Sequence, residues 1–158
     1  MSEAHLSIAC TFTGHGSARC SVTVGSTRQE LRASYLSDAL GDLVRAAAAM
    51  LKGADVVRCA FLEEPGEFRW VLSRKPGRRV ALRILAFSDD GLPEDRGKVI
   101  LSGEFSASAF ASAVYVALAG LQSRHGEEGY RQTWGHRFPL DAMRELQLSL
   151  GGAAQQAG

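Results

Sequence analysis

The stretch from Asp55 to Phe105 constrains the fold most, because apolar and polar side chains alternate along four successive segments of it. Successive side chains of a strand point to opposite faces, so each segment is expected to be a strand with one apolar face. Four antiparallel strands would then share a core on one side. The inward residues are Val57, Cys59 and Phe61; Phe68, Trp70 and Leu72; Val80, Leu82 and Ile84; and Val99, Leu101 and Phe105.

The first turn of this stretch, Glu63-Glu64-Pro65-Gly66, also predicts a register. If these residues form a four-residue loop, Phe61 falls opposite Phe68 and Cys59 falls opposite Trp70. A slip of one residue would turn this whole apolar face to water, so the register is expected to be strict.

Strand periodicity precedes this stretch and helical periodicity flanks it. Alternation predicts three more strands between Leu6 and Tyr35, with turns at residues 14–16 and near Gly25. The helical signals predict a first helix from about Asp38 to Leu51 with Ser37 as its N-cap, a second capped by Ser106, a short one carrying Tyr130 and Trp134, and a last one beginning near Leu140.

These elements predict an α+β fold with an antiparallel meander sheet of about six to seven strands and helices packed on one face. Residues 1–150 would form a single domain, followed by a disordered C-terminal tail at 151–158. The second helix is apolar on nearly every side, so we expect the first helix, the sheet, the C-terminal segment or a second subunit to cover it.

Composition and charge limit the classes of partner. The chain has 158 residues, 46% of them hydrophobic, and its 18 Lys and Arg residues balance 17 Asp and Glu residues. No bulk charge attracts it to nucleic acid or membrane. The first residues lack a basic region, and no apolar run reaches the length of about 18 residues that a membrane span needs. We expect a soluble cytoplasmic protein.

The three cysteines are expected to be reduced, because cytosolic disulfides are rare and no CxxC motif is present. A turn centred on His15 would nevertheless place Cys10 directly opposite Cys20 on paired strands. Labelling of thiols with and without reductant would decide between these alternatives.

The candidate partner-binding residues surround the first turn and the polar face of the same sheet. They are Glu63, Glu64, Glu67, Arg69, Arg58 and Arg83. Carboxylates gathered at a hairpin tip can bind a cation or a basic partner, with Arg69 holding one of them in place. The alternative is a solvated turn whose charges only keep the hairpin soluble.

Other polar clusters carry weaker signals. Arg74, Lys75, Arg78 and Arg79 flank a Pro-Gly turn that can reach phosphates, but no stacking aromatic accompanies them, so a solvated turn is favoured. The spacing of His125 and His136 fits no metal-ligand pattern, so neither a metal nor a cofactor is expected, and no catalytic residues are identified.

Three motifs resemble the signatures of a family of small proteins from high-GC bacteria. They are SYLSDALGD at residues 34–42, EEPGEFRW at 63–70 and GEEGY at 126–130. No activity is known for that family, so the resemblance implies neither a reaction nor any functional residue.

Two functions follow from these observations. The first is a non-enzymatic protein-binding module of the adaptor, chaperone or toxin-neutralising type, which binds a protein partner or itself as a homodimer. The alternative is a small-molecule binding protein or enzyme, with a pocket between sheet and helices. That pocket would be lined by Trp70, Phe68 and Tyr115, with polar groups from His125, His136 or Glu64.

Overall fold

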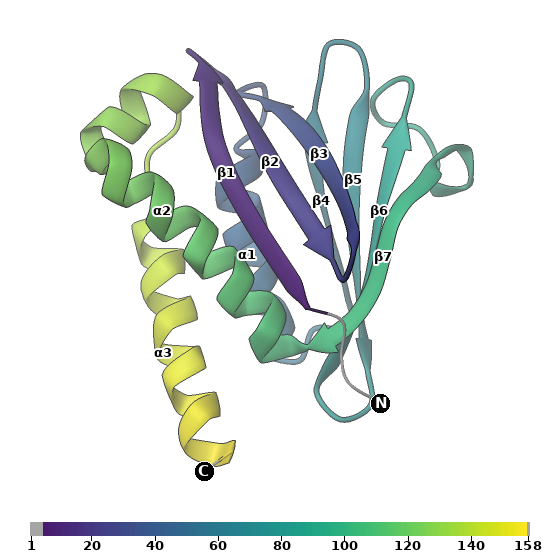
Figure 1. Ribbon diagram of the computed structural model, residues 1–158, viewed down its shortest axis with the longest axis vertical. Helices are drawn as coiled ribbons and strands as arrows, with labels where there is room; N and C mark the ends of the chain where they lie inside the picture. The colour runs from purple at the N-terminus through teal and green to yellow at the C-terminus, as the bar shows by residue number, and fades with distance from the viewer. Residues whose placement is uncertain (1–4, 158) are drawn as a thin grey trace.

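The computed structural model describes the backbone of residues 5–157 and the side chains of residues 5–151. It shows an α+β protein with two antiparallel sheets and three helices (Figure 1). The three-stranded sheet comprises β1 (Leu6–Gly14), β2 (Ser17–Val24) and β3 (Thr27–Ser34). The four-stranded sheet comprises β4 (Val56–Leu62), β5 (Glu67–Lys75), β6 (Arg79–Phe87) and β7 (Lys98–Ser106). The helices are α1 (Ala39–Leu51), α2 (Ala107–Trp134) and α3 (Leu140–Ala157), with a short 3₁₀ helix, η1 (Glu94–Arg96).

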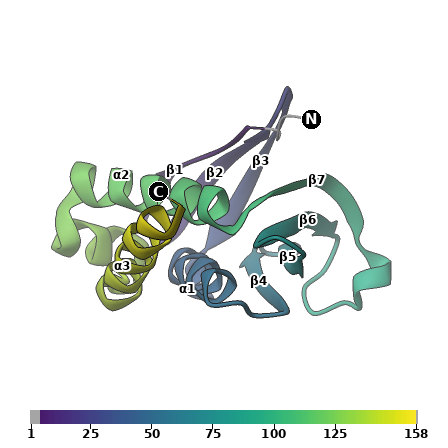
Figure 2. The ribbon, with the colours of Figure 1, turned by 90° about the horizontal axis from the view of Figure 1, so that it is seen from below.

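The predicted single meander sheet is wrong, because β3 and β4 are not hydrogen-bonded neighbours. The chain leaves β3 to form α1, which packs against β4, α2 and α3 (Figure 2). The two sheets still share one core, and the amide of Gln29 on β3 donates to the carbonyl of Ile100 on β7 at 3.2 Å. Gly103 allows their close approach, since a Cβ there would lie 3.0 Å from Val24.

The predicted register of the β4–β5 hairpin is confirmed. Phe61 pairs with Phe68, and Cys59 pairs with Trp70. Trp70 is fully buried and packs against Phe61 and against Phe110 of α2. The apolar faces of both sheets therefore meet the helices in a filled core.

Cys10 and Cys20 pair directly across β1 and β2, and the structure joins them in a disulfide. The expectation of reduced thiols is therefore wrong for this pair. The two Cα atoms are only 4.1 Å apart, and both side chains lie on the buried face of the sheet. The third cysteine, Cys59, is buried, and burial raises the pKa of its thiol far above the usual value.

The helices begin close to their expected positions. Asp38, rather than Ser37, caps α1, because its carboxylate accepts the backbone N–H of Gly41 at 3.2 Å. Ser106 caps α2 as predicted, accepting from Ala109 at 3.0 Å. The predicted second helix and the short helix carrying Tyr130 and Trp134 together form α2, with a kink at Gly126, where φ is 69°.

The apolar second helix is mostly covered by the chain itself. One side of α2 packs against β1, and others pack against α1 and α3. Val116 remains 65% exposed. Within residues 5–157, none of the helices has the length and apolar character that crossing a bilayer requires.

The C-terminal segment and the outer face of the four-stranded sheet complete the fold. The range of α3 includes most of residues 151–158, for which composition predicts disorder, while Gly158 lies outside the described residues. On the outer sheet face, the loop between β6 and β7 covers Val71 and Leu85 with Leu92. That face is therefore neither fully solvated nor fully available to a partner.

Candidate functional site: a basic cleft

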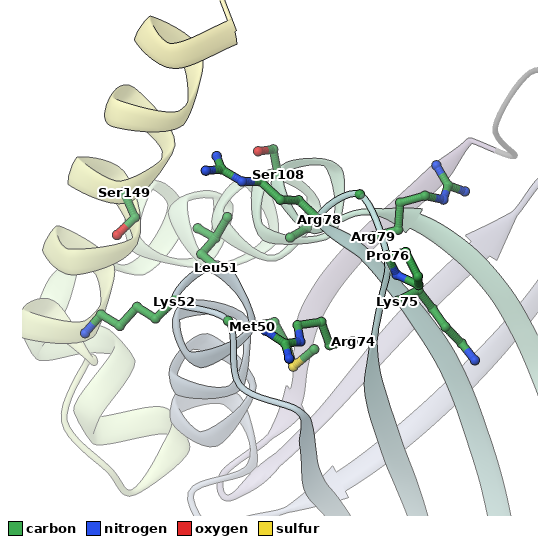
Figure 3. A pocket seen from close by; sticks show the side chains of 13 residues that line it. Met50, Leu51, Lys52, Arg74, Lys75, Pro76, Arg78, Arg79, Ser108 and Ser149 are labelled. Atoms are coloured by element: carbon green, nitrogen blue, oxygen red, sulfur yellow. The ribbon is translucent and has the colours of Figure 1, made fainter.

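A cleft of about 810 Å³ opens at one end of the molecule, where three elements meet (Figure 3). The end of α1, the tip of the β5–β6 hairpin and the first turn of α2 form most of its wall, and α3 contributes one side chain. Its lining consists of residues 50–53 and 74–79 together with Ala107, Ser108 and Ser149.

The lining is strongly basic. It includes Lys52, Arg74, Lys75, Arg78 and Arg79, and no Asp or Glu is part of it. Figure 3 shows Arg78 reaching across toward Ser108 and Lys52 directed toward α3, while the side chains of Lys75 and Arg79 extend to the other side of the hairpin. The floor is apolar and includes Met50 and Leu51. A wall of this kind favours ligands that carry negative charge and a short apolar segment.

Carboxylates from outside the lining pair with some of these cations. Lys52 forms an ion pair with Glu145 of α3, and Arg74 binds Asp55 at 2.9 Å. Lys75 makes no ion pair within the described part of the chain. The positive charge of the cleft is thus only partly neutralised by the protein.

The hairpin tip owes its position to an unusual backbone conformation at Arg78. Its φ is 57°, in the left-handed region that non-glycine residues seldom adopt, and the preceding Gly77 has a φ of 77°. This geometry directs the carbonyl of Arg78 to the N–H of Ala107, which donates to it at 2.8 Å. The hairpin therefore helps to cap α2 and holds its basic side chains beside the start of that helix.

The start of α2 adds to the positive potential. The first backbone N–H groups of a helix have no partners within it, and they carry a partial positive charge. Ala107 and Ser108 place this helix end in the cleft wall. The basic side chains of the lining and this helix end are together suited to holding an anion.

The candidate residues identified from sequence lie elsewhere, on the outer side of the four-stranded sheet. Glu67 is only 4% exposed and accepts from Arg69 at 2.7 and 3.2 Å and from the N–H of Gly91 at 3.0 Å. Burial opposes the ionisation of Glu67, but the hydrogen bonds from Arg69 and Gly91 outweigh it and hold the pKa of this carboxyl below its usual value.

Arg69 connects this carboxylate to the β6–β7 loop. Its guanidinium lies 4.2 Å from the ring centroid of Phe87 and donates to the carbonyl of Leu92 at 2.8 Å. Glu67 and Arg69 therefore clamp the loop onto the sheet. The other acidic candidates differ in exposure, since Glu64 is exposed and Glu63 is half-buried.

Arg58 and Arg83 converge on Glu94, which sequence reasoning did not single out. Arg58 donates to the carboxylate of Glu94, and Arg83 lies 3.6 Å from its other oxygen. The hydrogen bond from Arg58 lowers the pKa of Glu94. A partner-binding role for these six residues stays a prediction, and Glu64, Arg58 and Arg83 are the exposed members.

The residues expected to line a pocket between sheet and helices do not line this cleft. Trp70 is part of the filled core. The rings of His125 and Phe12 lie 4.9 Å apart, while His136 hydrogen-bonds the carbonyl of Tyr35 at 2.7 Å. Among the described residues, no group of His, Cys, Asp and Glu is arranged to hold a metal ion.

The cluster of basic residues at 74–79 was visible in the sequence, but the sequence could not show that the ends of α1 and α2 face it. Lys52 and Ser108 are distant in the chain and carry no local signal of their own. Comparison of the chain with protein-family models, with curated proteins and with solved structures finds no match.

Proposed function

We propose that this chain is a non-enzymatic module that binds a protein partner through an acidic segment lodged in the basic cleft. The observation that carries the proposal is the lining itself, which has five cationic side chains and no carboxylate. An acidic segment would place its carboxylates beside Lys75, which makes no ion pair within the described residues, and beside the neighbouring Arg and Lys groups of the lining.

The shape of the cleft supports a chain segment as the occupant. Its apolar floor of Met50 and Leu51 can bury a small side chain, while the basic rim binds the flanking charges. Self-association as a homodimer also stays a prediction, which light scattering of the purified chain tests.

The test uses Lys75→Glu, because this residue belongs to the lining at the hairpin tip and makes no ion pair within the described residues. The probe is a fluorescein-labelled peptide of alternating Glu and Ser, and binding is followed by anisotropy. We expect the charge reversal to weaken binding about tenfold, the equivalent of about 1.4 kcal/mol. Added salt should also weaken binding by the wild-type protein, because exposed charges are screened.

Lys98→Glu is the matched control. Lys98 is exposed at the start of β7, whereas the cleft lies beside Ser106 at the other end of that strand. This variant makes the same change of net charge and should bind the peptide within about twofold of wild type. Equal binding by wild type and Lys75→Glu, or equal binding of a Gln-and-Ser peptide, would refute the proposal.

A small anionic molecule is the second candidate, and the size of the cleft favours it. Its volume of about 810 Å³ lies in the range of about 300 to 1,000 Å³ that is usual for small-ligand sites. Pyrophosphate should then raise the melting temperature of the wild type more than that of Lys75→Glu. No shift with pyrophosphate, together with binding of the acidic peptide, would leave the protein partner as the occupant.

A further inference from the structure

The outer face of the three-stranded sheet carries two arginines in direct cross-strand register. Arg19 on β2 is the partner of Arg32 on β3, and Thr11 on β1 is the other partner of Arg19. Both arginines are exposed. The helices lie on the opposite side of this sheet, and no described segment covers its outer face (Figure 2).

This pairing is unfavourable for the isolated chain. Directly opposed residues of an antiparallel pair have Cβ atoms about 5 Å apart, and like charges in that position destabilise the sheet. Neither Arg19 nor Arg32 forms an ion pair within the described residues. Glu30 lies on the same face, but it pairs with Arg28 at 3.4 Å.

The surroundings leave the two guanidinium groups accessible from the solvent side. The next row across the sheet consists of Ala9, Ser21 and Glu30, so two small side chains adjoin the pair together with one carboxylate, which already pairs with Arg28. A planar guanidinium binds carboxylate through two parallel N–H groups, and two of them side by side can hold one carboxylate between them. That arrangement would convert a repulsive pair into a binding site.

We infer that Arg19 and Arg32 form a carboxylate clamp, and that the outer face of the three-stranded sheet docks a protein partner presenting an Asp or Glu side chain. This surface is separate from the basic cleft, so the inference holds or fails independently of the proposed function. The unpaired charge of the clamp is the feature that selects an acidic partner.

The first experiment measures folding stability. Arg19→Gln and Arg32→Gln remove the like-charge contact, so each should raise the urea midpoint at low salt. The urea midpoint of the double variant should be little higher than that of either single variant, since one substitution already removes the repulsion. Arg28→Gln is the matched control on the same face, and it should not raise the midpoint because Arg28 has a carboxylate partner. A lower midpoint for both clamp variants would mean that the arginines support the fold, which would overturn the clamp.

The second experiment measures binding of the labelled Glu and Ser peptide to the full chain. If Arg19→Gln and Arg32→Gln each lower the affinity for the peptide about fivefold or more while Lys75→Glu binds normally, the result supports the clamp and refutes the cleft proposal. The reverse pattern overturns the clamp and supports the cleft. If the clamp variants and Lys75→Glu all bind the peptide more weakly than wild type, both surfaces bind acidic segments.

A second copy of the chain is the remaining occupant, and light scattering identifies it. A wild-type dimer that becomes monomeric in Arg19→Gln, without any binding of the acidic peptide, would overturn the assignment to a separate partner protein. A wild-type protein whose mass does not change in either clamp variant, together with loss of peptide binding, supports the assignment.

Discussion

At the residue scale, Glu67 shows how a charged side chain can belong to the interior. Its carboxylate is nearly inaccessible and accepts hydrogen bonds from Arg69 and Gly91. A carboxylate paired in this way stabilises the folded state only while both partners stay in place, because removal of one leaves the other unsatisfied. On an exposed hairpin tip, the same carboxylate would be solvated and would contribute little to stability.

Glu67→Gln should lower the free energy of unfolding by about 1 to 3 kcal/mol at neutral pH, since a charge-assisted pair is lost. Urea denaturation measures the change, and Glu64→Gln on the exposed part of the turn should alter it by less than about 0.5 kcal/mol. Equal effects of the two substitutions would show that the contacts of Glu67 with Arg69 and the β6–β7 loop contribute nothing to stability.

The same carboxyl predicts a pH dependence. Its pKa in the folded protein is lowered, so its contribution to stability is fully present above the unfolded value of about 4.3 and disappears as the pH falls through the folded value. The difference in stability between wild type and Glu67→Gln should therefore shrink as the pH falls below about 4. A difference that stays constant down to acidic pH would contradict this assignment.

The disulfide between Cys10 and Cys20 is testable by labelling. Without reductant, only Cys59 should react with a thiol reagent, and only after unfolding, because burial raises the pKa of its thiol and covers it. Reduction should expose two more thiols and cost about 2 to 3 kcal/mol of stability, as expected for a bridge that closes a short loop. Three reactive cysteines in the unreduced, unfolded chain would exclude the bridge.

This bridge also bears on the expected cytoplasmic location, which stays a prediction. Stable disulfides are more common in oxidising compartments than in the cytosol. Labelling of the protein directly in lysed host cells, with thiols trapped at lysis, would show whether the pair is oxidised where the protein resides.

At the element scale, the start of α1 depends on Asp38. Its carboxylate accepts from the backbone of Gly41 and from the indole N–H of Trp134, both at 3.2 Å, and it pairs with Arg45 at 3.1 Å. The cap therefore also joins α1 to the end of α2. The hydroxyl of Ser37, the N-cap expected from sequence, is buried without a described hydrogen-bond partner.

Asp38→Ala should consequently destabilise the protein by about 1 to 3 kcal/mol, because it removes a cap and the partner of a buried indole. Ser37→Ala is the matched change next to it, and it should cost less than about 0.5 kcal/mol. Thermal or urea denaturation of the two variants measures the loss of stability. A larger loss in Ser37→Ala than in Asp38→Ala would identify Ser37 as the N-cap of α1, as expected from the sequence.

At the scale of the whole molecule, one core joins the two sheets. The main cluster of buried residues includes the inner faces of both sheets together with α1, α2 and α3. Such a core should unfold cooperatively, so Trp70 in the four-stranded sheet and Trp134 at the end of α2 should report the same transition. Fluorescence of Trp70→Phe and of Trp134→Phe, compared with far-UV circular dichroism, tests the single domain. Separated midpoints would show two folding units.

The sequence by itself determined the local pattern. Alternation in β4 and β5 predicted both the buried face and the pairing of Phe61 with Phe68, because the side-chain period of a strand is two and a slip would expose the core. The pairing of Cys10 with Cys20 followed in the same way from the short turn between them. Helical periodicity and Ser106 located the start of α2.

Tertiary structure decided what no local pattern contains. Whether α1 separates two sheets depends on how it packs against β4 and α2, and the burial of Glu67 depends on the path of the β6–β7 loop. The cleft gathers residues from 50 to 149, and the register places Arg19 beside Arg32 on an uncovered face. These features arise from contacts between distant segments, so they depend on the packing of the entire core rather than on neighbouring residues.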